Sequence, residues 1–205
     1  MSDTKIKLCG LSRACDIDVV NELLPEFIGF VFWDKSKRQV LDEQAKMLKK
    51  MLDSRIKAVG VFVDETPQRV AQLAESGIID VIQLHGKEDD SYISKLRGIT
   101  DKPIIKAFKI SDITDIKNAE RSSADYIMAD AGKGTGTRFD WSLLEELHRP
   151  YFLAGGLSLE NVAEAVNTLH PYAVDVSSGI ETHGLKDENK MRGFVHIVRN
   201  GEKEV

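Results

Sequence analysis

"AVGVFVDETPQRVAQLAESG", residues 58–77, contains one complete strand-and-helix unit. Its first part, residues 58–63, is apolar without a clean alternation, which is typical of a strand covered on both faces. The second part carries the signals of a helix: Thr66 as the N-cap, Pro67 at the first helical position and Gly77 as the stop. The stretch therefore predicts a buried strand followed at once by an amphipathic helix.

The same unit recurs along the chain. Strand-like runs are IKLC (6–9), IGFVF (28–32), AVGVFV (58–63), DVIQLH (80–85), PIIKAFKI (103–110), YIMAD (126–130), YFLAGG (151–156) and AVDVSSG (173–179). Helix patterns follow them at 13–23, 42–53, 66–77, 89–97, 111–121, 140–148, 158–170 (with Ser158 as the cap) and 187–199. This rhythm predicts the α/β class and a single (β/α)8 TIM barrel domain over residues 1–205. A doubly wound open sheet is the alternative, although it usually has fewer strands and an unmatched edge.

Composition narrows the classes of partner. The chain has 205 residues and a formal net charge of -5, so it lacks the broad basic field that binds nucleic acid. Its longest apolar run, residues 27–33, is too short for a signal-peptide core or a membrane span. Cys9 and Cys15 fit neither a disulfide framework nor a zinc site. We therefore expect reduced thiols in a cytoplasmic protein, with no membrane, nucleic-acid or metal partner.

Polar residues gather at the expected ends of the strands. In barrels of this kind the active site lies at the C-terminal ends of the strands, where the loops between strand and helix converge. The residues at these positions are Cys9, Phe32, Asp64, His85, Asp130, Gly155 with Gly156, and Asp175 with Ser177. An apolar core does not explain so many polar residues at one end, so we predict the active site there.

Two neighbouring loops predict a phosphate site. They read AGGLSLEN after the seventh strand and VSSGIETHGLKD after the eighth, and they contribute Gly155, Gly156, Ser177, Ser178 and Gly179. Glycines let the backbone approach a ligand closely, and these two loops form the recurrent phosphate cradle of the fold. Ordinary turns would explain each glycine singly, but both loops together favour a small phosphorylated substrate.

Cys9 and Asp130 form a candidate acid–base pair. Their strands are three steps apart on a closed ring, or roughly 14 Å of arc, and the phosphate loops lie between them. A thiolate and a carboxylic acid on opposite sides of one carbon skeleton suit general acid–base chemistry. Lys7 shares the face of Cys9, and we hypothesise that it favours the thiolate. Taken alone, Cys9 reads as a small buried apolar residue and Asp130 as a helix cap; Cys15 keeps the first reading.

The stretch GKGTG, residues 132–136, does not indicate a nucleotide site. It lacks the spacing of a dinucleotide-binding fingerprint and the residue order of a Walker loop. We interpret the 131–138 loop as a flexible lid over the substrate.

Seven motifs carry a resemblance to a known family. They are KLCGL (7–11), GFVFWDKSKR (29–38), VGVFVDE (59–65), QLHG (83–86), GKGTGTRFDW (132–141), AGGL (154–157) and VDVSSGIE (174–181). In this order and spacing the chain resembles the phosphoribosylanthranilate isomerase family over nearly its whole length. The resemblance implies an Amadori rearrangement of N-(5-phosphoribosyl)anthranilate to 1-(2-carboxyphenylamino)-1-deoxyribulose 5-phosphate in tryptophan biosynthesis, without metal or cofactor.

The resemblance also implies residue roles. Asp130 matches the general acid that opens the ribose ring, and Cys9 matches the general base that removes the proton from C2. Arg38 matches the arginine that binds the anthranilate carboxylate, a role for which a forked guanidinium is suited. His85 matches a histidine lining the pocket, and Asp175 a carboxylate near the substrate amine.

Two other functions fit part of the pattern. A histidine-pathway isomerase performs the same rearrangement in a similar barrel, but it resembles two halves with a phosphate site each and uses paired aspartates. A barrel that only binds phosphosugars would need the phosphate loops but neither Cys9 nor Asp130. The sequence allows a monomer or a homodimer, and it assigns no role to His183.

Overall fold

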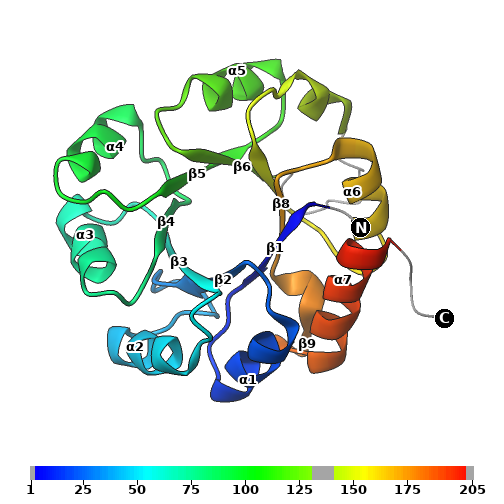
Figure 1. Cartoon of the computed structure of the whole chain (residues 1–205). Coiled ribbons are helices and arrows are strands. Elements are labelled where there is room, and N and C mark those ends of the chain that lie inside the picture. Colours follow the sequence, from blue (N-terminus) through cyan, green and yellow to red (C-terminus); the bar gives the residue numbers. More distant parts are fainter. Residues whose placement is uncertain (1–2, 131–140, 202–205) are drawn as a thin grey trace.

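The computed structural model describes residues 3–130 and 141–201, and it is a closed barrel of eight parallel strands with helices around it (Figure 1). The barrel strands are β1 (Lys5–Cys9), β2 (Phe27–Val31), β3 (Lys57–Phe62), β4 (Val81–Leu84), β5 (Ile104–Lys109), β6 (Tyr126–Asp130), β7 (Tyr151–Ala154) and β8 (Ala173–Val176). The helices are α1 (Ala14–Leu23), α2 (Asp42–Met51), α3 (Pro67–Glu75), α4 (Asp90–Arg97), α5 (Ile113–Arg121), α6 (Val162–Leu169) and α7 (Glu188–Asn200).

The pairing of β1 closes the ring. On one side Lys7 lies opposite Phe27 of β2, and on the other side it lies opposite Asp175 of β8. A doubly wound sheet would leave both of its outer strands without such a second neighbour, so the closed pairing confirms the predicted barrel.

The predicted elements are present, with two local differences. Thr66 caps α3 as expected, accepting a hydrogen bond from the Arg69 N–H at 3.4 Å. The helix expected at 140–148 is a short 3-10 helix, η1 (Trp141–Glu146), and residue 140 lies outside the described residues. The helix expected to start from a Ser158 cap begins only at Val162, because Ser158 donates its N–H to Asn161 Oδ1 at 2.9 Å within a turn.

The barrel interior changes character along its axis. At the N-terminal ends of the strands it is aromatic: the rings of Phe27 and Phe152 are 5.3 Å apart, and those of Tyr126 and Tyr172 are 5.2 Å apart. Strand residues alternate between the two faces, and the next inward positions along the strands include several polar residues. They include Lys7, Gln83, Met128 and Asp175, followed at the C-terminal ends by Cys9, His85 and Asp130.

Two smaller observations concern the rest of the chain. Within residues 3–130 and 141–201, every helix is too short or too polar to traverse a lipid bilayer. Both cysteines are free thiols, but Cys15 is exposed on α1, so the expectation that it packs as a buried apolar residue is wrong.

Candidate active site

Cys9 ends β1 with its thiol inside the barrel. Its register partner on β2 is Gly29, and a Cβ atom at Gly29 would come within 2.6 Å of the Cys9 Sγ. The missing side chain therefore makes the space that the sulfur occupies. Val31 and Val61 complete the apolar wall around the thiol. Only 7% of Cys9 is exposed, so the reactive position is close to fully enclosed by protein.

The charges below Cys9 act in opposite directions on its pKa. Burial raises the pKa of the Cys9 thiol above its ordinary value, and the Lys7 ammonium lowers it by a smaller amount. Lys7 itself is fully buried and donates to Asp175 Oδ1 at 2.7 Å. Lys7 thus acts in the hypothesised direction, but burial and the Asp175 carboxylate both raise the pKa of Cys9, and their combined effect outweighs that of Lys7.

Asp130 and His85 face each other at the end of β6. His85 Nε2 lies 3.3 Å from Asp130 Oδ2, and His85 Nδ1 lies 2.9 Å from the amide nitrogen of Gln83. His85 therefore bridges Gln83 and the candidate acid Asp130. The sequence predicted His85 as a pocket-lining residue. The structure gives it a specific neighbour, the candidate acid.

A buried ion pair anchors the loop that bears His85. Glu88 accepts hydrogen bonds from the N–H groups of Asp64 (2.7 Å) and Gly86 (2.8 Å) and from Lys106 Nζ (2.9 Å). Glu88 and Lys106 are both buried, and neither was singled out in the sequence. The Asp64 carboxylate also serves this loop, accepting from the Lys87 N–H at 2.6 Å. Asp64 therefore belongs to the support of the loop.

The two glycine-rich loops after β7 and β8 lie in direct contact. A Cβ atom at Gly179 would lie 2.0 Å from the carbonyl oxygen of Leu157, so only glycine fits where the loops meet. Gly155 and Gly156 take φ angles of 90° and 69°, which glycine adopts without strain. The structure thus brings together the two segments that the sequence predicted to cradle a phosphate.

The predicted phosphate residues Ser177 and Ser178 follow β8, and a buried lysine holds the first of them. Lys186 Nζ donates to the Ser177 carbonyl oxygen at 2.9 Å and to its Oγ at 3.3 Å. A hydroxyl that accepts from an ammonium keeps its own proton for another acceptor. Burial lowers the pKa of Lys186 below its usual value, while Glu181 acts in the opposite direction.

Arg38 reaches the same region from the loop after β2. Its aliphatic stem crosses the backbone after Cys9: a Cβ atom at Gly10 would be 2.5 Å from Arg38 Cδ. Its guanidinium donates from Nε and Nη2 to the two carboxylate oxygens of Glu181, at 2.5 and 2.8 Å. This bond raises the pKa of Arg38. The sequence predicted a ligand carboxylate as the partner of Arg38, and the structure shows that a protein carboxylate already occupies two of its donors.

A small hairpin after β8 supplies both Glu181 and Lys186, which sequence reasoning missed. Its strands are β9 (Glu181–Thr182) and β10 (Leu185–Lys186), and Lys186 lies opposite Glu181 in the ladder. His183 and Gly184 form the two-residue turn, with φ angles of 52° and 79°. Two such left-handed residues are typical of tight hairpins, so the pair His–Gly was the available signal. His183 is therefore a turn residue.

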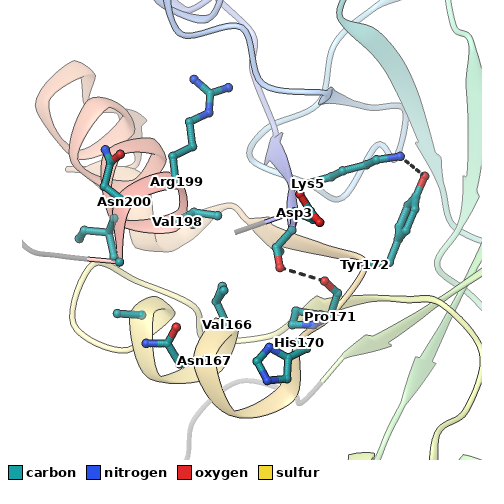
Figure 2. A pocket seen from close by; sticks show the side chains of 14 residues that line it. Asp3, Lys5, Val166, Asn167, His170, Pro171, Tyr172, Val198, Arg199 and Asn200 are labelled. Carbon is teal, nitrogen blue, oxygen red and sulfur yellow. Dashed lines mark hydrogen bonds between the residues drawn. The ribbon is translucent and has the colours of Figure 1, made fainter. Parts of the chain in front are cut away.

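A groove at the other end of the barrel is a rival location. Figure 2 shows it between α6, α7 and the start of β1, with Lys5, Asn167, His170 and Arg199 around it. Its volume is about 750 Å³, and Lys5 Nζ donates to the Tyr172 hydroxyl at 2.6 Å. None of the predicted site residues lines this groove. It also lies at the end of the barrel where these folds do not place their chemistry.

The described residues thus assemble a thiol, a carboxyl with a histidine partner, two adjoining glycine loops and an arginine at one end of the barrel. Cys9 and Asp130 end strands β1 and β6, and the loops after β7 and β8 lie between them in the ring. No group of three or more His, Cys, Asp or Glu side chains in residues 3–130 and 141–201 is arranged to hold a metal ion. The predicted lid, 131–138, lies outside the described residues.

Comparisons with known proteins show the family of the chain. The family model for N-(5'phosphoribosyl)anthranilate (PRA) isomerase matches residues 6–197. The N-(5'-phosphoribosyl)anthranilate isomerase of Endomicrobium trichonymphae is 44% identical over 201 residues, covering 96% of this chain and 98% of the relative. The crystal structure of the phosphoribosyl anthranilate isomerase from Thermotoga maritima superposes with a TM-score of 0.85 at 32% identity, covering 96% of this chain and 98% of that one.

A second crystal structure holds a ligand. It is a phosphoribosyl anthranilate isomerase in complex with reduced 1-(o-carboxyphenylamino)-1-deoxyribulose 5-phosphate. It matches with a TM-score of 0.83 at 32% identity, and the match covers 96% of this chain and 98% of that one. With a family model over most of its length and relatives this similar, the chain belongs to the N-(5'-phosphoribosyl)anthranilate isomerase family.

Proposed function

We propose that this chain isomerises N-(5'-phosphoribosyl)anthranilate to 1-(2-carboxyphenylamino)-1-deoxyribulose 5-phosphate, in the biosynthesis of tryptophan, by general acid–base catalysis. Family membership supports the overall reaction. One observation carries the assignment of residues: the phosphate loops after β7 and β8 separate Cys9 from Asp130 in the ring. A phosphosugar anchored there has one group on each side of its carbon chain.

The first step is ring opening at Asp130. As a carboxylic acid, Asp130 gives its proton to the ribose ring oxygen, the C1–O bond breaks, and the anilino nitrogen supplies electrons to form an iminium. His85 supports this step, because its Nε2 lies 3.3 Å from Asp130 Oδ2 and helps to orient the carboxyl group.

The second step is removal of the C2 proton by Cys9. As a thiolate, Cys9 accepts this proton, and the electrons of the C–H bond flow to the iminium to give an enolamine. Tautomerisation of the enolamine to the ketone completes the reaction. C2 is oxidised while C1 is reduced, so electrons and atoms balance inside the substrate. The Lys7 and Lys186 ammonium groups favour the thiolate, against the cost of burial.

Substrate binding uses groups at both ends of the molecule. The phosphate is bound by the loops that carry Gly155, Gly156, Ser178 and Gly179, and by the Ser177 hydroxyl. Glycine-rich backbone suits this task, because its N–H groups come close to a dianion. The anthranilate carboxylate is bound by Arg38, whose planar fork matches a carboxylate. Asp175, held by Lys7 on the cavity floor, contributes to the amine end of the substrate.

The test is an assay of the purified protein with freshly prepared phosphoribosylanthranilate. We expect Cys9→Ala and Asp130→Asn each to lower kcat by roughly 10²–10⁴-fold with a modest change in KM, because each group acts mainly in the transition state. Cys15→Ala is the matched control, since it removes an exposed thiol and leaves Cys9 in place. Wild-type turnover by both variants would refute the assignment. Binding without turnover by the wild-type protein would instead indicate a phosphosugar-binding barrel.

A further inference from the structure

Glu181 lies beside the site, between Arg38 and Lys186, and has no part in the proposed chemical steps. From their geometry we infer that Glu181, fixed by Lys186, is a positioning residue: it holds the Arg38 guanidinium in the orientation that binds the substrate's carboxylate. This inference rests on the proposed function and deepens it by naming what makes the carboxylate site rigid.

The contact between Glu181 and Arg38 uses only one edge of the guanidinium. Glu181 engages the guanidinium along one edge, taking Nε and Nη2 at 2.5 and 2.8 Å. A guanidinium has five N–H donors in one plane, so this bond leaves three donors for a second, coplanar carboxylate. Glu181 therefore fixes the plane of the Arg38 guanidinium and leaves donors for the substrate carboxylate.

Glu181 is itself held in place by its surroundings. Its side chain is only 8% exposed, and Lys186 Nζ donates to its Oε1 at 2.6 Å. The Lys186 side chain is 2% exposed and also binds both oxygens of Ser177, in the predicted phosphate loop. The carboxylate that orients Arg38 is thus tied to the loop that binds the other end of the substrate. The same hairpin therefore holds the residues that bind the two ends of the ligand.

An arginine without this contact would bind more weakly. Arg38 is on a loop, and its long side chain is 31% exposed. Ordering such a side chain on binding costs conformational entropy and so lowers the affinity. Glu181 removes that cost before the substrate arrives. Its negative charge does not simply repel the substrate, because it lies between two cations, Arg38 and Lys186.

The experiment compares two ligands that differ in one group. The first is reduced 1-(o-carboxyphenylamino)-1-deoxyribulose 5-phosphate, and the second is the same compound without the carboxyl group. Dissociation constants are measured by calorimetry for the wild type, Glu181→Gln, Arg38→Met and the double variant of both. Glu43→Gln is the control, because the Glu43 side chain is 88% exposed on α2.

We expect the preference of the wild type for the carboxylated ligand to fall about tenfold in Glu181→Gln, while affinity for the other ligand stays within about twofold. Arg38→Met should abolish the preference, and adding Glu181→Gln to it should change nothing further. In turnover, Glu181→Gln should raise KM with little change in kcat, because the carboxylate contact is the same in ground and transition states. Glu181→Gln with Lys186→Met, which conserves net charge, should lose the preference equally.

Three other outcomes would each contradict the positioning role, the proposed function or both. An unchanged preference in Glu181→Gln, with a strong preference in the wild type, would refute the positioning role and leave the proposed function standing. Tighter binding of the carboxylated ligand by Glu181→Gln would show that Glu181 competes with the substrate. A wild type that binds neither ligand would refute the proposed function together with this inference.

Discussion

The two ends of the barrel are built from the same strands but differ in chemistry. At the N-terminal end, inward residues such as Phe27, Tyr126 and Phe152 form an aromatic plug, beside a groove of about 750 Å³ (Figure 2). At the C-terminal end the same strands present Cys9 and Asp130. The difference teaches that the presence of a groove does not by itself locate the chemistry here. The inward residue at the end of each strand does.

Two lysines on β1 show the contrast most directly. Lys5 lies at the open N-terminal end, where its Nζ donates to the Tyr172 hydroxyl and sits 4.2 Å from the centre of that ring. Lys7, two residues later, is fully buried and paired with Asp175. Both lysines point inward by the alternation of the strand. Only Lys7 is removed from water, so the two are expected to matter very differently.

The largest expected effect on stability is that of Lys7→Met. Removing the ammonium leaves the Asp175 carboxylate buried without its partner, and we expect the free energy of unfolding to fall by about 3–5 kcal/mol. Lys5→Met is the matched control, with an expected loss of about 1 kcal/mol or less, because its contacts are partly exposed. Urea unfolding of both variants measures the difference. Equal losses of unfolding free energy would show that burial does not make Lys7 more important for stability than Lys5.

A medium effect on stability is expected when one glycine at each end of the barrel is replaced by alanine. Gly179→Ala forces a Cβ against the Leu157 carbonyl, so we expect a loss of roughly 1–3 kcal/mol in unfolding free energy together with weaker binding of inorganic phosphate. Gly201→Ala, at the C-cap of α7 with a φ of 76°, meets no atom within 4 Å. It should cost about 1 kcal/mol from backbone strain and leave phosphate affinity unchanged. Unaltered phosphate affinity in Gly179→Ala would contradict the predicted cradle.

The smallest expected effect is a dependence of turnover on pH. Burial raises the pKa of Cys9, so its thiolate fraction at neutral pH is small. Because the reaction needs Cys9 as a thiolate and Asp130 as a carboxylic acid, kcat/KM should rise with pH, by up to about tenfold per unit, only while Asp130 keeps its proton. Ultraviolet absorbance of the thiolate in a Cys15→Ser background, where Cys9 is the only cysteine, measures the ionisation of Cys9 independently. A Cys9 that titrates below the ordinary thiol range would be the opposite result.

The sequence predicted the barrel because its signals are local and repeated. Apolar runs with intervening capped helices, such as the unit around Thr66, fix the element order, and closure follows from the number of strands. The strand-end positions of Cys9 and Asp130 followed from the same order. The helix expected from Ser158 started later because a side chain–backbone hydrogen bond at Asn161 competes with the helix at that turn.

The network around the site was not predictable in the same way. The pairs Arg38–Glu181 and Glu88–Lys106 join residues far apart in the chain, and no local pattern reports which cation meets which carboxylate. The net direction of the pKa of Cys9 also depends on burial, which only the packed structure fixes. Sequence thus located the rim of the site, and tertiary packing decided how its charges are paired.

The most direct measurement of the central claim is a crystal structure of this protein with reduced 1-(o-carboxyphenylamino)-1-deoxyribulose 5-phosphate. We expect the phosphate between the loops that carry Gly156 and Gly179, with the sugar chain lying between the sulfur of Cys9 and the carboxyl of Asp130. A ligand bound instead in the groove beside Lys5, or a sugar chain out of reach of either group, would contradict it.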